Sequence, residues 1–209
     1  YAFPVDTLQD WVTYGDVFVT FTVTKAEPVP LSREDAERSE GVLTESYLTA
    51  EIEEIHWTRL GASSIPSAVT FTWLAAVRVA GRDIPAVTNS GQVLEVGNRY
   101  VGLFYRMDSD RWQPLASETL AGVGADGLVV VPGQAPSSSS QASIDGKSVS
   151  EVGELLSTTP QYVDFSADED LTPLERYCRV AEAGGPKGVL GLDPCQVAAT
   201  ATSATSSAD

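Results

Sequence analysis

The chain is 209 residues long and 43% hydrophobic, so it can bury a sizeable core as one domain, or as a smaller domain with an appendage. Its 13 Lys and Arg stand against 29 Asp and Glu, and the net charge of −16 argues against nucleic-acid phosphates and anionic lipid as partners. No apolar run approaches the length of about 20 residues that a membrane-spanning helix needs, so no transmembrane segment is expected.

The N-terminal region predicts a short helix followed by a long strand. Within residues 1–15, Asp6 or Thr7 can act as the helix N-cap and Gly15 can end the helix. The apolar residues at helical spacing are Leu8, Trp11 and Val12. Residues 16–26, DVFVTFTVTKA, then alternate with a period of two and are rich in β-branched and aromatic residues, which predicts a strand. One of its faces belongs in a core and the other near the core's edge; the core-facing residues are Val17, Val19, Phe21 and Val23.

Several later segments predict further strands. The alternation over residues 46–57 changes phase after Glu53, as a β-bulge would cause. Strands are also predicted at residues 68–74, 100–107, 111–116 and 128–131, whereas residues 76–80 fit either a short strand or a loop. Asp108 to Asp110 form the predicted turn of a hairpin. The sequence therefore predicts a mainly β domain over residues 1–131.

The composition changes after residue 131. Residues 132–143, PGQAPSSSSQAS, predict a Pro/Gly/Ser linker. Residues 144–196 predict a helical extension that docks on the barrel expected for residues 1–131, with helices at 148–156 and 173–183 whose N-caps are Ser148 and Thr172. Residues 197–209 contain almost no core-forming residues and predict a flexible tail.

Cys178 and Cys195 are the two cysteines, and they bracket a Gly/Pro-rich loop. In an exported chain such a pair predicts a disulfide, with free buried thiols as the alternative. The chain begins at Tyr1 without a methionine, which we interpret as a mature form whose signal peptide has been removed. The expected location is extracellular or at the cell surface.

The sequence assigns no catalytic, cofactor-binding or metal-binding residue. His56 is the single histidine, lies within a predicted strand, and is accompanied by no G-x-S-x-G motif and no phosphate-binding motif. Glu51, Glu53 and Glu54 fit the wet face of that strand, although a carboxylate pair for acid–base chemistry remains an alternative. The acidic residues at 108–110 and 168–170 fit turns and loops. Their oxygen ligands leave calcium binding as an alternative, although neither group has the EF-hand spacing.

Aromatic residues on the predicted strands favour either core packing or a stacking platform on an exposed face. The candidates for a binding face are Trp57, Trp73, Tyr105 and Trp112.

The order of the predicted strands resembles the netrin-like module, the OB-type barrel that includes the tissue inhibitors of metalloproteinases. It is also similar to uncharacterised exported bacterial proteins with the same pattern. The segments that carry the resemblance, within about residues 15–116, are GDVFVTFTV, YLTAEIEEIHWTRLG, AVTFTW and VLEVGNRYVGLFYRMDSDRWQPL. The resemblance implies a small OB-like β barrel that binds other molecules. The inhibitory activity does not carry over, because those inhibitors begin with a zinc-chelating cysteine where this chain has Tyr1.

The expected function is that of a non-enzymatic exported or cell-surface protein that acts through protein–protein interaction or self-association, without a cofactor. Two alternatives are a secreted binder resembling a protease inhibitor and a carboxylate-dependent hydrolase of unrecognised type. An extended N-terminal ridge would favour the first alternative. A cleft with two converging carboxylates, one of them with a raised pKa, would favour the second.

Overall fold

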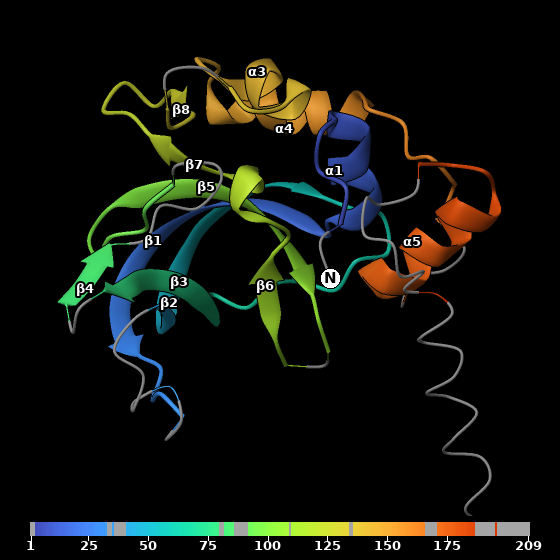
Figure 1. Ribbon diagram of the computed structural model, residues 1–209. Helices are drawn as coiled ribbons and strands as arrows, with labels where there is room; N and C mark the ends of the chain where they lie inside the picture. The colour runs from blue at the N-terminus through green and yellow to red at the C-terminus, as the bar shows by residue number, and fades with distance from the viewer. Residues whose placement is uncertain are drawn as a thin grey trace, which may run out of the picture.

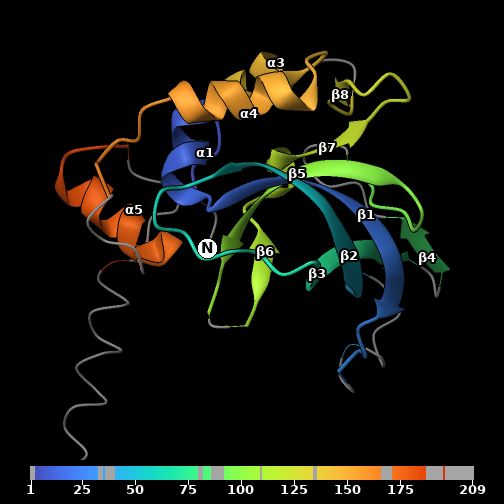
Figure 2. The same ribbon diagram turned by 180° about the vertical axis from the view of Figure 1, so that it is seen from behind.

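The computed structural model describes residues 3–32, 35, 41–79, 82–85, 92–108, 110–133, 136–165, 171–186 and 195. Their centre is an antiparallel sheet with the strand order β4–β3–β2–β1–β5–β7–β8, and β6 pairs with β5 beside this path. Helices α1, α3 and α4 lie together over one side of the sheet, and α5 lies beyond its end (Figures 1 and 2). The mainly β prediction is confirmed.

The elements have the following bounds. The strands are β1 (Val17–Pro28), β2 (Val42–Thr58), β3 (Ala68–Val79), β4 (Arg82–Pro85), β5 (Arg99–Arg106), β6 (Trp112–Pro114), β7 (Leu120–Val123) and β8 (Val129–Val130). The helices are α1 (Leu8–Tyr14), α3 (Ser139–Ile144), α4 (Val149–Thr158) and α5 (Pro173–Glu182), with a 3₁₀ turn, η1, at Ser117–Thr119.

The hydrogen-bonded sheet does not close into the predicted barrel. Its path ends at β4 and at β8, and no ladder among the described residues joins these two strands. The outer side of β8 is occupied by the chain that leads into α4. There, Val129 N–H donates to the Lys147 carbonyl at 2.8 Å, and Gly146 N–H donates to the Val129 carbonyl at 2.9 Å. These bonds use the groups that a closing strand would need.

Strand β1 is buried on both faces over its first half. Its inward residues belong to a cluster that also contains Phe71 and Phe104, whereas Phe18 points to a second cluster beneath the helices. Thr20, on the same side as Phe18, is fully buried as well. The sequence predicts only one core-facing side for this strand. The alternation of apolar and polar residues does not reveal that helices cover the opposite side.

Two bulges on β2 shape its pairing with β1. Thr20 lies opposite Glu54 and Phe21 opposite Ile52, so Glu53 is the extra residue, which confirms the predicted phase change. A second irregularity follows, because Phe18 lies opposite Trp57 and Val19 opposite Ile55, so that His56 is extra. Such bulges bend and twist a strand.

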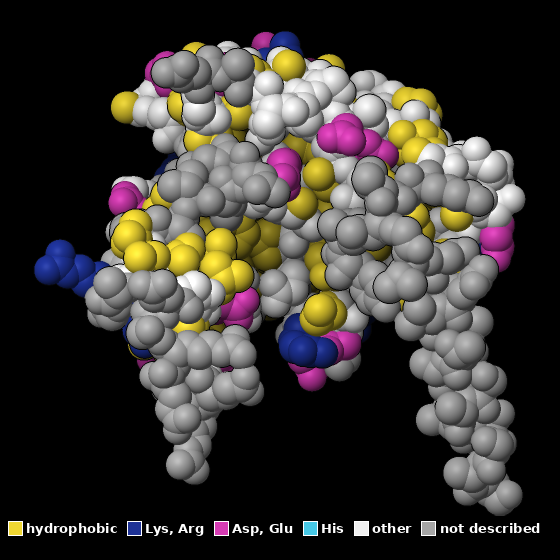
Figure 3. Space-filling model, viewed as in Figure 1, with side chains coloured by type: hydrophobic (Ala, Val, Ile, Leu, Met, Phe, Trp, Pro, Cys, Tyr) yellow, Lys and Arg dark blue, Asp and Glu magenta, His cyan; other side chains and the backbone are white. Residues whose placement is uncertain are grey.

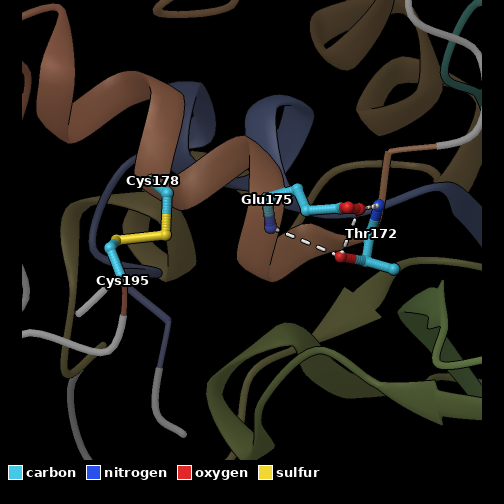
Figure 4. The surroundings of a disulfide bond; sticks show 4 residues. All are labelled: Thr172, Glu175, Cys178 and Cys195. Carbon is cyan, nitrogen blue, oxygen red and sulfur yellow. Dashed lines mark hydrogen bonds between the residues drawn. A yellow bond between two sulfur atoms is a disulfide. The ribbon is translucent and has the colours of Figure 1, made fainter. Parts of the chain in front are cut away.

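The three predicted helices are present; the N-caps of α4 and α5 are those predicted, and of the two candidates for α1 the structure has Thr7. Thr7, Ser148 and Thr172 each accept a bond from the backbone N–H three residues on, and each forms a capping box. Figure 4 shows the capping box of α5 and the neighbouring cysteines. The sulfur atoms of Cys178 and Cys195 lie at disulfide distance and their Cα atoms are 5.5 Å apart, in agreement with the predicted disulfide. In the chain-entropy model a loop of this size stabilises by about 3 kcal/mol.

The segment predicted as a linker differs from the expectation. Its second half belongs to α3, where Ser140 N–H donates to the Asp6 carbonyl at 2.9 Å and Ser140 Oγ to the Val5 carbonyl at 2.8 Å. Serine is a poor helix former alone, so the helix is held by these long-range contacts, which composition does not reveal.

Strand β7 lies in a segment for which the sequence predicts no strand. The tail, 197–209, and the acidic loop at 168–170 lie outside the described residues.

Helix α4 crosses β2 at a glycine. A Cβ atom built on Gly153 would lie 2.7 Å from the His56 carbonyl oxygen, closer than real Cβ contacts allow. Because the obstructing atom belongs to a strand backbone, it cannot swing away as a side chain would. Gly153 therefore sets how closely α4 approaches β2.

The first prediction concerns this crossing. Helix propensity alone would make Gly153→Ala stabilising by about 1 kcal/mol, but the clash with the His56 carbonyl should reverse the sign and destabilise the fold by about 1–3 kcal/mol. Urea unfolding followed by tryptophan fluorescence measures the change. The control is Glu154→Ala on the exposed side of the same helix, expected within about 0.5 kcal/mol of the unchanged protein. A Gly153→Ala variant as stable as the parent would contradict the close approach.

Candidate functional site

The predicted binding-face aromatics do not form one platform. Trp57 and Tyr105 pack against the cluster beneath the helices, whereas Trp73 and Trp112 belong with the cluster on the inward side of β1. Trp112 is buried there. Trp57, partly exposed at the end of β2, lines a hollow that a ligand could enter.

Two of the carboxylates singled out in the sequence, Glu53 and Asp108, are held by hydrogen bonds from neighbouring groups. The Thr22 hydroxyl donates to Glu53 at 2.5 Å and Arg99 Nε donates to it at 2.7 Å. The hydrogen bond from Thr22, and to a smaller extent the bond from Arg99, hold the pKa of Glu53 below its ordinary value. Asp108 accepts the backbone N–H groups of Asp110 and Arg111, so it serves the turn. No group of three or more metal-binding side chains occurs among the described residues.

His56 is buried beside Thr20. Its Nε2 atom lies 2.8 Å from Thr20 Oγ1 and 3.8 Å from a Glu54 carboxylate oxygen. Both neighbours lie on one ring nitrogen, whereas a catalytic triad places the hydroxyl and the carboxylate on opposite nitrogens. Burial lowers the pKa of His56 below its ordinary value, so the ring is neutral at pH 7. This arrangement fits the structural role considered for His56 in the sequence.

Asp16 forms a buried ionic cluster that the sequence did not single out. Its Oδ1 atom lies 3.0 Å from Arg59 Nε and 3.1 Å from Arg176 Nη2, and its Oδ2 accepts the Arg106 backbone N–H at 2.9 Å. All three charged side chains are nearly inaccessible to solvent. Burial lowers the pKa of Arg176 to about 10, so its guanidinium still carries a charge at pH 7. One carboxylate thus joins the start of β1 to the end of β2, the end of β5, and α5.

A cleft of about 490 Å³ opens beside this cluster, between the end of β2 and the chain that leaves α4. Figure 2 shows β2 passing beneath α4 toward α5. The wall residues combine apolar and polar groups, as small binding sites do. They are Val12, His56, Trp57, Thr58, Arg59, Leu60, Leu156, Ser157, Thr159, Gln161 and Asp164.

Within the part of the chain that the structure describes, the end of β2 is paired on one side only. β3 pairs with β2 as far as Glu51, whereas β1 continues to Thr58. The loop 59–67 makes no backbone hydrogen bond to residues 53–58. The apolar side chains along this stretch remain exposed: Ile55 is 46% exposed and Leu60 is 72% exposed. The cleft therefore adjoins a strand edge without a partner strand in the described structure.

A second exposed apolar row crosses the other end of β2. Leu43 lies opposite Val77, which lies opposite Ile84 on β4, so the three residues share one face of the sheet. Leu43 is 60% exposed and Ile84 is also exposed. Hydrophobic side chains gather in the region of β3 and β4 in Figure 3 as well. This row provides a comparison surface for the cleft.

The second prediction tests the Asp16 cluster. Asp16→Asn removes the negative charge while leaving two buried guanidinium groups, and breaking such a buried pair typically destabilises by about 3–5 kcal/mol. Urea unfolding of the oxidised protein measures the loss. The exposed Asp6→Asn is the control, with an expected change below about 0.5 kcal/mol. Equal stability of the two variants would mean that Asp16 does not hold these elements together.

The third prediction concerns pH. Because the folded state lowers the pKa of His56, the unfolded chain binds this proton more readily. The contribution of His56 is therefore present above about pH 6.5 and is lost as the pH falls below it. His56→Gln keeps a polar group facing Thr20 but cannot titrate. It should lose less stability than the parent between about pH 7.5 and about pH 5.5 in urea unfolding. Parallel losses in both proteins would contradict burial of the imidazole.

Comparison with protein families, curated proteins and solved structures finds no match to this chain. The similarity to netrin-like modules consequently remains a prediction from the strand pattern. No helix among the described residues is long and apolar enough to cross a membrane. The cysteine pair fits a secreted protein.

Proposed function

We propose that this protein is an exported, non-enzymatic binding protein that contacts another polypeptide through the cleft at the end of β2. The observation that carries the proposal is the unpaired end of β2, flanked by exposed Ile55 and Leu60 and adjoining a cleft of mixed polarity. Exposed apolar residues beside polar groups are typical of protein contact sites.

The cysteine pair supports export, because disulfides persist in oxidising compartments. The OB-type interpretation belongs to the same proposal. β6, which pairs with β5, also contacts β3, although no ladder joins β6 to β3. The sheet therefore curls enough to bring these two strands together. A five-stranded, partly open barrel has such an arrangement, and its surface commonly binds extended polymers.

The alternatives receive less support. Phe3 stacks on Tyr14 with ring centroids 5.8 Å apart and contacts Tyr105 at 5.9 Å, so at this residue the N-terminal segment packs inward rather than projecting as a ridge. Glu53, with its lowered pKa, is unsuited to act as a general acid. Self-association through the edge of β4 is opposed by the four-residue length of that strand and its terminal Pro85.

The fourth prediction compares two equally drastic surface changes. Leu60→Asp should weaken binding of the partner at least about tenfold, because it introduces a charge at the rim of the cleft. Leu43→Asp makes the same change on a similarly exposed leucine of the other apolar row, and should leave affinity within about twofold. The immobilised oxidised protein captures polypeptides from the extracellular fraction of its source, and the purified partner's affinity for each variant is then measured.

Two outcomes would overturn the proposal. Binding that is lost in Leu43→Asp and kept in Leu60→Asp would move the contact to the β2–β3–β4 row. Failure to capture any polypeptide whose binding depends on Leu60 would remove the cleft as a protein contact site.

A further inference from the structure

We infer that the partner binds by strand addition: an extended polypeptide segment, carrying a cationic side chain, pairs with the free edge of β2 around Thr58. This inference rests on the proposed function and specifies the kind of partner that the cleft takes. It follows from the backbone at the end of β2, the apolar side chains beside it and the local charge.

The backbone of Thr58 points away from β1. Arg59 N–H donates to the Asp16 carbonyl at 2.8 Å, so Arg59 faces β1. The backbone groups of successive strand residues point to opposite sides, and those of Thr58 therefore face the side where β3 is no longer paired. Among the described residues, no backbone hydrogen bond outside the strand ladders uses Thr58. Its N–H and carbonyl are therefore available to an added strand.

The surrounding side chains suit an extended segment. An added strand directs alternate side chains to opposite faces of the sheet. The partly exposed Trp57 and the buried Leu156 supply apolar wall on the cleft side, and Leu60 supplies an exposed apolar rim. Main-chain bonds then provide affinity, while these surfaces select the alternate side chains.

Charge indicates a cationic residue on the partner. Glu54 has a side chain that is 65% exposed and is 3.8 Å from His56, which is neutral at pH 7 because burial lowers its pKa. Glu53, by contrast, is already paired with Arg99. The net charge of −16 also opposes a second copy of this chain and favours a basic partner. Glu54 is thus the carboxylate available to a lysine or arginine of the added segment.

The test uses random dodecamer peptides displayed on phage and selected on the full oxidised chain, with counter-selection on Leu60→Asp. The selected peptide is synthesised and its affinity measured against Thr58→Pro and Thr58→Val. Proline removes the N–H that faces the cleft and spares the ladder to β1, whereas valine keeps that N–H. We expect Thr58→Pro to weaken binding at least about tenfold and Thr58→Val to change it less than about twofold.

A second measurement needs no change in the protein. N-methylation of the peptide's backbone amides, one at a time, should weaken binding at alternate positions only, because every second amide of an added strand faces β2. Glu54→Gln should weaken binding about threefold and reduce its dependence on salt.

The possible outcomes distinguish a failure of strand addition from a failure of the proposed function. Equal binding to Thr58→Pro and Thr58→Val, or N-methyl effects without alternation, overturns strand addition while the cleft remains a contact site if Leu60→Asp still abolishes binding. Peptides that bind Leu60→Asp as well as the parent, or a library that yields no Leu60-dependent peptide, overturn both strand addition and the proposed function.

Discussion

The carboxylate of Asp16 is the contact on which the rest of this structure depends. It accepts hydrogen bonds from Arg59 at the end of β2 and from the Arg106 backbone at the end of β5, and it pairs with Arg176 on α5. Placing three ionised side chains away from water is unfavourable unless they satisfy one another, so the folded chain must bring all of these segments together at once. Because Asp16 directly precedes β1, the same contact sets where the central strand begins. Helix α5 and the ends of three strands are therefore held together at this one contact.

The contacts of Asp16 also determine which residues line the cleft. Arg59 is held inward by Asp16, and its backbone N–H is bound to the Asp16 carbonyl. The neighbouring Thr58 and Leu60 consequently stand on the open side of β2, where β3 has already separated. Gly153 lets α4 approach the His56 carbonyl closely enough to form the wall above. The buried Asp16 cluster and the unpaired edge of β2 thus adjoin one another. In the proposed function, the cluster holds the edge in place for a partner.

Local patterns predicted the elements well. The capping residues Thr7, Ser148 and Thr172, the hairpin turn at Asp108 and the phase change at Glu53 all act within a few residues, and the structure contains each of them. The failures are long-range. The helix at Ser139–Ile144 is held by carbonyls more than a hundred residues earlier, which its serine-rich composition does not reveal. Nor does a sequence show that Asp16, Arg59 and Arg176 converge, or that Trp57 and Trp112 belong to separate cores. The Gly15–Asp16 pair before the long strand was the one available signal of the cluster, and it also fits an ordinary turn.

The most direct test of this account is amide hydrogen exchange of Thr58 and Arg59 in the native protein, measured by NMR on a ¹⁵N-labelled sample. The Arg59 amide, bound to the Asp16 carbonyl, should exchange slowly, while the adjacent Thr58 amide, which faces the unpaired edge, should exchange orders of magnitude faster. Addition of the selected peptide should then slow Thr58 specifically. Equal and strong protection of both amides in the free protein would contradict the account, because it would mean that the end of β2 already has a partner on its outer side.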